Sequence, residues 1–219
     1  SSLVTNRLTP IFVDIDEKSF NLNPKNIEKL ITQKTSAILP VHVFGNACEV
    51  EKIEQIAKKH RLKVVYDAAH AFDVKYKDKS ILEFGDISTL SFHATKLFHT
   101  IEGGAIIAND DELAQKIRYL INFGIKNSTE IAYLGTNAKM NEFEAAMGLC
   151  VLDDIENIKE KRKVVIKNYR KELKDLVQFQ EQNINASENY SYFPIVLKNE
   201  EQLLKVQKAL NDENIFPRR

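Results

Sequence analysis

The chain has 219 residues, of which 43% are hydrophobic, enough to bury the core of one domain or of one domain and part of another. Its 31 basic and 31 acidic side chains give a formal net charge of zero, which favours neither nucleic acid nor an anionic membrane as a partner. No apolar run reaches the roughly 18 residues of a membrane helix, and two cysteines outside any metal-like spacing, Cys48 and Cys150, indicate a reducing, cytoplasmic compartment.

Short strand-like runs alternate with amphipathic helical patterns in the first half of the chain. Strands are predicted at 11–16 and 36–45 and helices at 24–32 and 49–60. The buried run LKVVYDAAH predicts a strand with Asp67 at its carboxyl end. Two more strands are predicted in DISTLSFH and GGAIIAND. This order is typical of the α/β class, with a mostly parallel sheet sandwiched by helices.

The second half of the chain is mainly helical. The run DELAQKIRYLINFG predicts a helix, a loop follows, and residues 141–176 have a long helical pattern. The tail predicts one strand and one helix, too little for an independent core, so we expect the start of a smaller α+β domain after a boundary near 150–165. Both ends of the chain are abrupt, and we expect both to be truncated.

Asp67, Ser91 and Lys96 supply the groups that a pyridoxal enzyme needs, in chain order. Such enzymes use a lysine amine for a Schiff base, a carboxylate that keeps the pyridine nitrogen protonated, and contacts to a phosphate. Because ligands of open α/β sheets bind beyond the carboxyl ends of the strands, Asp67 and His70 are in the expected place. The spacing alone equally allows Asp67 to cap a turn and Lys96 to be a solvated surface lysine.

Other candidate sites have simpler interpretations. His42, His60 and His93 have no partner at zinc-like spacing, so no metal site is expected. The basic run KEKRKVVIKNYRKELKD contains interspersed acids at helical spacing, which favours a solvated helix face over a nucleic-acid-binding stripe.

Four segments, in order, resemble one family of enzymes. DISTLSFHATKLFHTIEGGAIIAND resembles the lysine segment of the DegT/DnrJ/StrS family of sugar-nucleotide aminotransferases, and YDAAHAF resembles its aspartate segment. PVHVFGNACEVEKIEQIAKKH and GTNAKMNEFEAAMGL are similar to two further family segments. The resemblance implies a pyridoxal 5'-phosphate aminotransferase of fold-type I. Residues 1–155 would form the large cofactor-binding domain, with its N-terminal part missing, and 156–219 the connecting helix and the start of a small C-terminal domain.

The resemblance also implies roles for individual residues. It assigns the Schiff base to Lys96, the pyridinium salt bridge to Asp67 and a phosphate contact to the Ser91 hydroxyl. His70 lies where the family often has a glutamine near the ring hydroxyl of the cofactor.

Asn137 matches a family asparagine that reaches the cofactor phosphate of the neighbouring subunit, which implies a homodimer with shared active sites. The sequence departs from the family pattern at Ile101, where glycine is usual, and at His99, where a small or amide residue is usual. The small-residue phosphate motif and the stacking aromatic residue from the front of the family are missing from this sequence, which would weaken cofactor binding.

The implied reaction moves an amino group from glutamate to the keto carbon of a nucleotide-linked deoxysugar, with Lys96 also acting as general acid and base. A dTDP-4-keto-6-deoxyhexose is favoured over a 3-keto isomer, in the setting of cell-surface polysaccharide or O-antigen biosynthesis. Two alternatives remain: a non-catalytic regulator that binds pyridoxal phosphate or sugar nucleotide with the same fold, and a structural fragment that binds neither. The pair Asp67 and Lys96 favours the enzyme, whereas the missing front segment favours the fragment.

Overall fold

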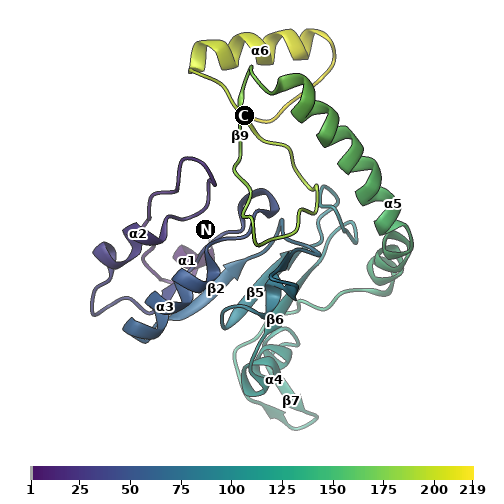
Figure 1. Ribbon diagram of the computed structural model, residues 1–219. Helices are drawn as coiled ribbons and strands as arrows, with labels where there is room; N and C mark the ends of the chain where they lie inside the picture. Colours follow the sequence, from purple (N-terminus) through teal and green to yellow (C-terminus); the bar gives the residue numbers. More distant parts are fainter. Residues whose placement is uncertain (1) are drawn as a thin grey trace.

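The computed structural model describes residues 2–219, and a four-stranded sheet forms its centre (Figure 1). In spatial order the strands are β1 (Ala37–Ile38), β2 (Lys63–Asp67), β5 (Ile87–Ser91) and β6 (Gly104–Ala108). β1, β2 and β5 run parallel to one another, and β6 pairs antiparallel with β5. The predicted α/β fold with a mostly parallel sheet is therefore confirmed, and β6 makes the sheet mixed.

Helix α3 (Val50–His60) packs its apolar side on the sheet. Its Val50, Ile53 and Ala57, spaced three and four residues apart, are all buried. From β2, Val64 and Tyr66 alternate into the same core. Since a fully buried aliphatic side chain contributes about 2 kcal/mol, this packing fixes the position of β2 and of the residues at its carboxyl end.

The N-terminal segment differs from the prediction. Residues 11–16 are extended but make only an isolated bridge, and Phe12 is 87% exposed. An alternating pattern becomes a strand only where a neighbouring strand pairs with it, and none of the four strands of the sheet pairs with this run. The helix predicted at 24–32 is split into α2 (Pro24–Ile27) and the 3₁₀ turn η1 (Glu28–Leu30).

The strand predicted at 36–45 is reduced to the two residues of β1. Pro40 has no N–H with which to continue the ladder, although its carbonyl accepts a hydrogen bond from the Asp67 N–H at 2.9 Å. The chain then turns at η2 (Val43–Gly45), where Phe44 adopts a left-handed conformation with φ 58°. This turn brings Phe44 to the carboxyl edge of the sheet.

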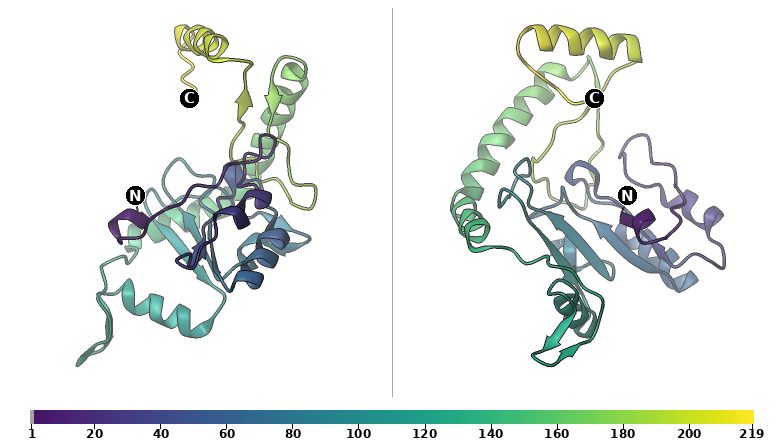
Figure 2. Two further views of the ribbon diagram at one scale, coloured as in Figure 1. Left: turned by 90° about the vertical axis from the view of Figure 1, so that its left-hand side faces the viewer. Right: turned by 180° about the vertical axis from the view of Figure 1, so that it is seen from behind.

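Residues 111–140, which we name the arm, follow β6 and project away from the sheet (Figure 2). The arm begins with α4 (Asp111–Leu120), whose N-cap, Asp110, accepts a first-turn N–H at 2.8 Å. The loop predicted after this helix contains a small hairpin of β7 (Ile125–Asn127) and β8 (Glu130–Ile131).

The long helix α5 (Glu142–Leu173) confirms the helical pattern predicted at 141–176. It begins with a capping box in which Asn141 and Glu144 bond to each other's backbone, and it runs without a break past the proposed domain boundary. Beyond it, the chain forms β9 (Gln178–Phe179), β10 (Ile195–Val196) and α6 (Glu200–Asp212). Between β9 and β10, residues 180–193 fold back onto the sheet, and we name them the return segment (Figure 1).

Four shorter elements complete the fold: α1 (Ser2–Thr5), β3 (Lys75–Tyr76), β4 (Lys79–Ser80) and the 3₁₀ turn η3 (Ile81–Glu83). None of the helices within residues 2–219 combines the length and the hydrophobicity that a membrane span requires.

Candidate active site

The carboxyl ends of β2 and β5 bring the predicted residues to one edge of the sheet. Asp67 is the last residue of β2 and Ser91 the last of β5, and these strands are parallel neighbours. Lys96 follows five residues after Ser91, in a turn closed by a hydrogen bond from its N–H to the His93 carbonyl at 2.9 Å. The parallel pairing therefore places the carboxylate, the hydroxyl and the amine at the same edge.

Asp67 is held by the backbone on both sides. Its carboxylate accepts the Ala69 N–H at 3.0 Å, and its carbonyl accepts the His42 N–H at 3.0 Å. A carboxylate has about four acceptor positions, so this internal bond leaves capacity for a ligand N–H. The contact with Ala69 is also the one expected if Asp67 caps a turn. One carboxylate can cap the turn and still bind a ligand N–H.

His70 is a neutral hydrogen-bond donor in this site. Its Nδ1 accepts the Phe44 N–H at 3.1 Å, so the proton of the neutral ring is assigned to Nε2. Burial lowers the pKa of His70 below its ordinary value, the positive charge of Lys96 lowers it further, and the negative charge of Asp67 opposes the shift. At neutral pH the ring therefore offers an N–H donor, as the amide of a glutamine would.

Two aromatic residues that the sequence pattern did not indicate complete the group around Lys96. The rings of Phe44 and His70 are stacked with centroids 5.9 Å apart, and the Tyr192 ring lies 4.4 Å from His70 and 5.7 Å from Phe44. The Lys96 amine donates a hydrogen bond to the Tyr192 phenol oxygen at 3.4 Å. Tyr192 lies 96 residues after Lys96, and only the fold of the return segment relates the two.

Ser91 and the loop after it form the second side of the site. The half-buried Ser91 accepts the His93 N–H on its hydroxyl oxygen at 3.4 Å, and His93 bonds to Thr95 at 2.9 Å. Ile101 lies further along this loop with φ 71°, and it is the single β-branched residue among the described non-glycine residues with positive φ. A β-branched side chain is strained in this conformation, which explains why glycine suits the position.

Asn137 lies apart from these residues. It is exposed on the arm, where its backbone bridges to Asn122 and its side-chain oxygen accepts the Lys139 N–H at 3.4 Å. These contacts keep Asn137 within the arm, and its role toward a second subunit remains a prediction.

The described part of the chain contains no cluster of candidate metal ligands. Among residues 2–219, no three or more His, Cys, Asp or Glu side chains are grouped to hold a metal ion.

Comparison with known proteins relates this site to one enzyme family. Residues 1–218 match the DegT/DnrJ/EryC1/StrS aminotransferase family. The chain is 46% identical over 222 residues to a dTDP-4-amino-4,6-dideoxy-D-glucose transaminase of Shigella dysenteriae, and 41% identical over 223 residues to a protein of that name from Escherichia coli. Each match covers 100% of this chain and 60% of the relative, so the chain spans about three-fifths of the length of these relatives.

A solved structure supports the same relationship. The crystal structure of DesI in the presence of its TDP-sugar product superposes with a TM-score of 0.91 and 34% identity, over 99% of this chain and 57% of that one. The chain therefore belongs to the DegT/DnrJ/EryC1/StrS aminotransferase family.

Proposed function

We propose that the protein is a pyridoxal-phosphate-dependent aminotransferase that transfers an amino group from glutamate to a nucleotide-linked keto-deoxysugar. The observation that carries this proposal is the convergence of Asp67, His70 and Lys96 on one sheet edge in a chain of an aminotransferase family. A dTDP-4-keto-6-deoxyhexose is the favoured acceptor, because the relatives at 46% and 41% identity are named as transaminases of a dTDP-4-amino-4,6-dideoxy sugar. A 3-keto isomer is the alternative acceptor.

The donor set fits pyridoxal phosphate. Asp67 would pair with the protonated pyridine nitrogen, the His70 Nε2–H would donate to the ring hydroxyl oxygen, and Ser91 would donate its hydroxyl proton to the phosphate. Lys96 would hold the cofactor through its amine. When bound, the cofactor supplies an electron sink for the carbon that loses or gains the amino group.

Lys96 has a second task in this proposal. When its amine is free, Lys96 would take a proton from the substrate carbon as a general base and give one back as a general acid. A neutral His70 suits this step, because an imidazolium beside the amine would add a second positive charge to the site.

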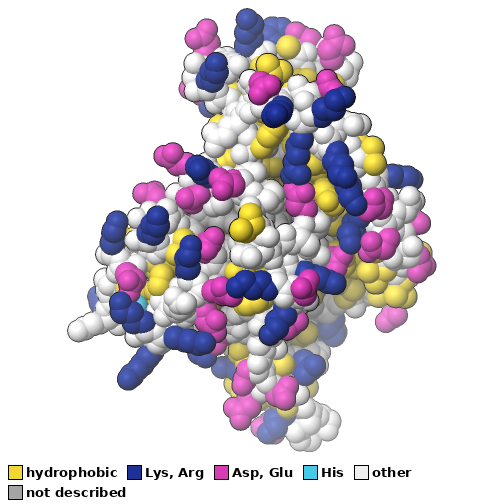
Figure 3. All heavy atoms as spheres, viewed as in Figure 1, with side chains coloured by type: hydrophobic (Ala, Val, Ile, Leu, Met, Phe, Trp, Pro, Cys, Tyr) yellow, Lys and Arg dark blue, Asp and Glu magenta, His cyan; other side chains and the backbone are white. Residues whose placement is uncertain are grey.

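We further propose that the active protein is a homodimer in which Asn137 reaches the active site of the neighbouring subunit. We also propose that it works in a reducing, cytoplasmic compartment. Large apolar side chains are exposed on the arm and on the first half of α5: Leu134 is 99% exposed, Phe143 90% and Leu149 66%. Hydrophobic side chains are visible along the α5 side of the molecule (Figure 3). Burial against a second copy would remove this surface from water.

The cofactor assignment can be tested by absorbance. Purified full-length protein mixed with pyridoxal phosphate should develop the visible band of a lysine-bound cofactor, Lys96→Ala should lose that band, and the exposed-lysine control Lys79→Ala should keep it. No band in the wild type would refute the proposal. A band without amino transfer from glutamate to either the 4-keto or the 3-keto nucleotide sugar would refute the enzyme and favour the regulator.

Shared active sites can be tested by mixing two inactive variants. If Asn137 serves the neighbouring subunit, dimers formed from Lys96→Ala and Asn137→Ala chains contain one site with both residues intact, and activity returns. Mixtures that stay as inactive as the two variants alone would show that the site belongs to a single chain.

A further inference from the structure

The return segment brings one side chain, Tyr192, to the reacting amine. Tyr192 is half-buried, its phenol oxygen lies 3.4 Å from the Lys96 Nζ, and that Nζ lies 5.9 Å from the centroid of the Tyr192 ring. The ring is tilted by 46° against His70 at 4.4 Å. Tyr192 therefore touches the amine with its hydroxyl while its ring packs on the imidazole.

The placement of Tyr192 is fixed by a buried amide three residues earlier. Asn189 is 2% exposed, and its side-chain N–H groups donate to the carbonyls of His70 at 2.8 Å and of Phe72 at 2.9 Å. Its side-chain oxygen accepts the Ser191 N–H at 3.2 Å. Gly45 allows this approach, because a Cβ at that position would lie 2.7 Å from the Asn189 side-chain oxygen. The same amide thus joins the return segment to the backbone of His70.

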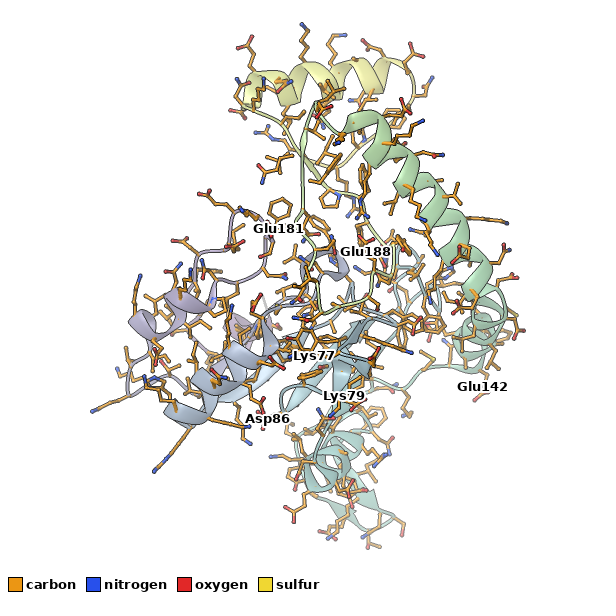
Figure 4. The ribbon with its side chains drawn as sticks, in the orientation of Figure 1. Lys77, Lys79, Asp86, Glu142, Glu181 and Glu188 are labelled. Carbon is orange, nitrogen blue, oxygen red and sulfur yellow. The ribbon has the colours of Figure 1, made fainter. Side chains whose placement is uncertain are left out.

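Helix α5 holds the return segment from its other side. Arg162 donates to the Ser191 carbonyl at 3.0 Å, and Arg170 forms two charge-assisted hydrogen bonds to the Glu188 carboxylate. Glu188 is seen on the return segment beside α5 (Figure 4). A segment held from both the site and the helix has little freedom to move Tyr192 away from the amine.

We propose that Tyr192 is a positioning residue for Lys96, and that its phenol holds the lysine amine in place by a hydrogen bond during proton transfer. This inference rests on the proposed function, because it concerns the amine that would shuttle the proton. A phenol both accepts and donates hydrogen bonds. It can accept from the ammonium form of Lys96 and donate to the free amine, so the contact persists through both halves of a proton shuttle. The face of the ring favours the cationic form.

Two measurements on Tyr192→Phe test the proposal, with Tyr190→Phe as matched control. Phenylalanine keeps the ring and removes only the hydroxyl. Tyr190 lies on the same segment near Lys163 and Arg170 of α5 and has no contact with Lys96 among the described residues, so its variant removes a phenol hydroxyl and leaves the Lys96 contact in place. The melting temperature of each variant shows whether the fold is kept.

The first measurement needs no cofactor. Cofactor-free protein is treated with an amine-directed reagent, and the labelling rate of the Lys96 peptide is followed by mass spectrometry. Tyr192→Phe should raise that labelling rate about three- to tenfold. The effect is modest because a charge-assisted hydrogen bond of 3.4 Å is weaker than a typical one. Equal rates in wild type, Tyr192→Phe and Tyr190→Phe would overturn the contact itself.

The second measurement is steady-state turnover with glutamate and the ketosugar. Tyr192→Phe should lower kcat about tenfold and leave the KM for glutamate within about twofold, since the phenol is lost from proton transfer and not from binding. A changed labelling rate with unchanged kcat would overturn the positioning role. If the wild type neither binds pyridoxal phosphate nor turns over, the proposed function fails, while the labelling result still decides the contact.

Discussion

Replacing Asn189 by alanine removes a buried side chain that joins the return segment to the backbone of His70 in the candidate active site. The side chain makes three hydrogen bonds, at 2.8 and 2.9 Å to the carbonyls of His70 and Phe72 and at 3.2 Å from the Ser191 N–H. A typical internal hydrogen bond contributes about 1 kcal/mol net, and an unsatisfied buried partner costs about 1–3 kcal/mol. With the residue 2% exposed, we expect Asn189→Ala to lower the free energy of unfolding by about 3 kcal/mol.

Asn189→Asp should be at least as damaging, although it has nearly the same shape. A carboxylate keeps the bond from the Ser191 N–H, but its second oxygen is an acceptor and faces the two carbonyls to which the amide nitrogen donates. An uncompensated buried charge costs about 3–5 kcal/mol, unless the carboxylate is protonated. The difference between the aspartate and alanine variants should therefore shrink as the pH is lowered.

Urea unfolding measures these effects. The control is Ile184→Ala, on the same segment, where a 95% exposed side chain should change the free energy of unfolding by less than about 0.5 kcal/mol. A second readout is the labelling rate of Lys96, which should rise in Asn189→Ala because Tyr192 loses its anchor. A loss below about 1 kcal/mol would refute the argument, since the segment would then be held by other contacts.

Three further predictions concern pH, backbone strain and the arm. Burial lowers the pKa of His42 to about 3, against 6.5 in the unfolded chain. The contribution of the neutral ring to the free energy of unfolding is therefore complete above pH 6.5 and is lost as the pH falls toward 3. Between pH 7 and 5.5 the free energy of unfolding should fall by about 1 kcal/mol through His42, and His42→Phe should remove this part of the pH dependence in urea unfolding; identical pH slopes in both proteins would contradict it. Ile101→Gly should raise the melting temperature by relieving up to about 1 kcal/mol of strain at φ 71°, whereas a lower melting temperature would show that the side chain stabilises the loop. At Gly124, with φ 77°, a Cβ would lie 1.7 Å from the Tyr133 carbonyl oxygen, so Gly124→Ala should destabilise the fold of the arm by about 2 kcal/mol or more. The proposed dimer should then dissociate more readily in sedimentation experiments. An unchanged dimer would show that the interface lies elsewhere.

Local patterns were sufficient for the central part of the site. The alternation in β2 and the apolar side of α3 predict a buried strand that ends at Asp67, and the same reasoning places Ser91 at the end of β5. Parallel neighbours bring their carboxyl ends together, so the grouping of these residues with Lys96 follows from the order of the elements. The resemblance of the lysine segment to the aminotransferase family added the expected chemistry, and the family match over residues 1–218 confirmed the relationship.

The failures occurred where pairing partners, and not local preference, decide structure. Residues 11–16 have the composition of a strand, yet no strand of the described sheet pairs with them. Pro40 interrupts the ladder between β1 and β2, which resumes only as an isolated bridge from Val41 to Asp67. β6 pairs antiparallel, although its pattern does not specify direction.

The amino-acid sequence by itself thus determined the α/β class, the long helix α5 and the order of Asp67, Ser91 and Lys96 along the chain. The tertiary structure alone decided that Tyr192, 96 residues beyond Lys96, lies at its amine, and that the Nδ1 of His70 accepts the Phe44 N–H. The physical reason is that secondary-structure periodicity is a property of neighbours within a few turns. The contact of Tyr192 depends on the buried amide of Asn189 and on the close approach at Gly45, and both exist only once the return segment has folded back onto the sheet.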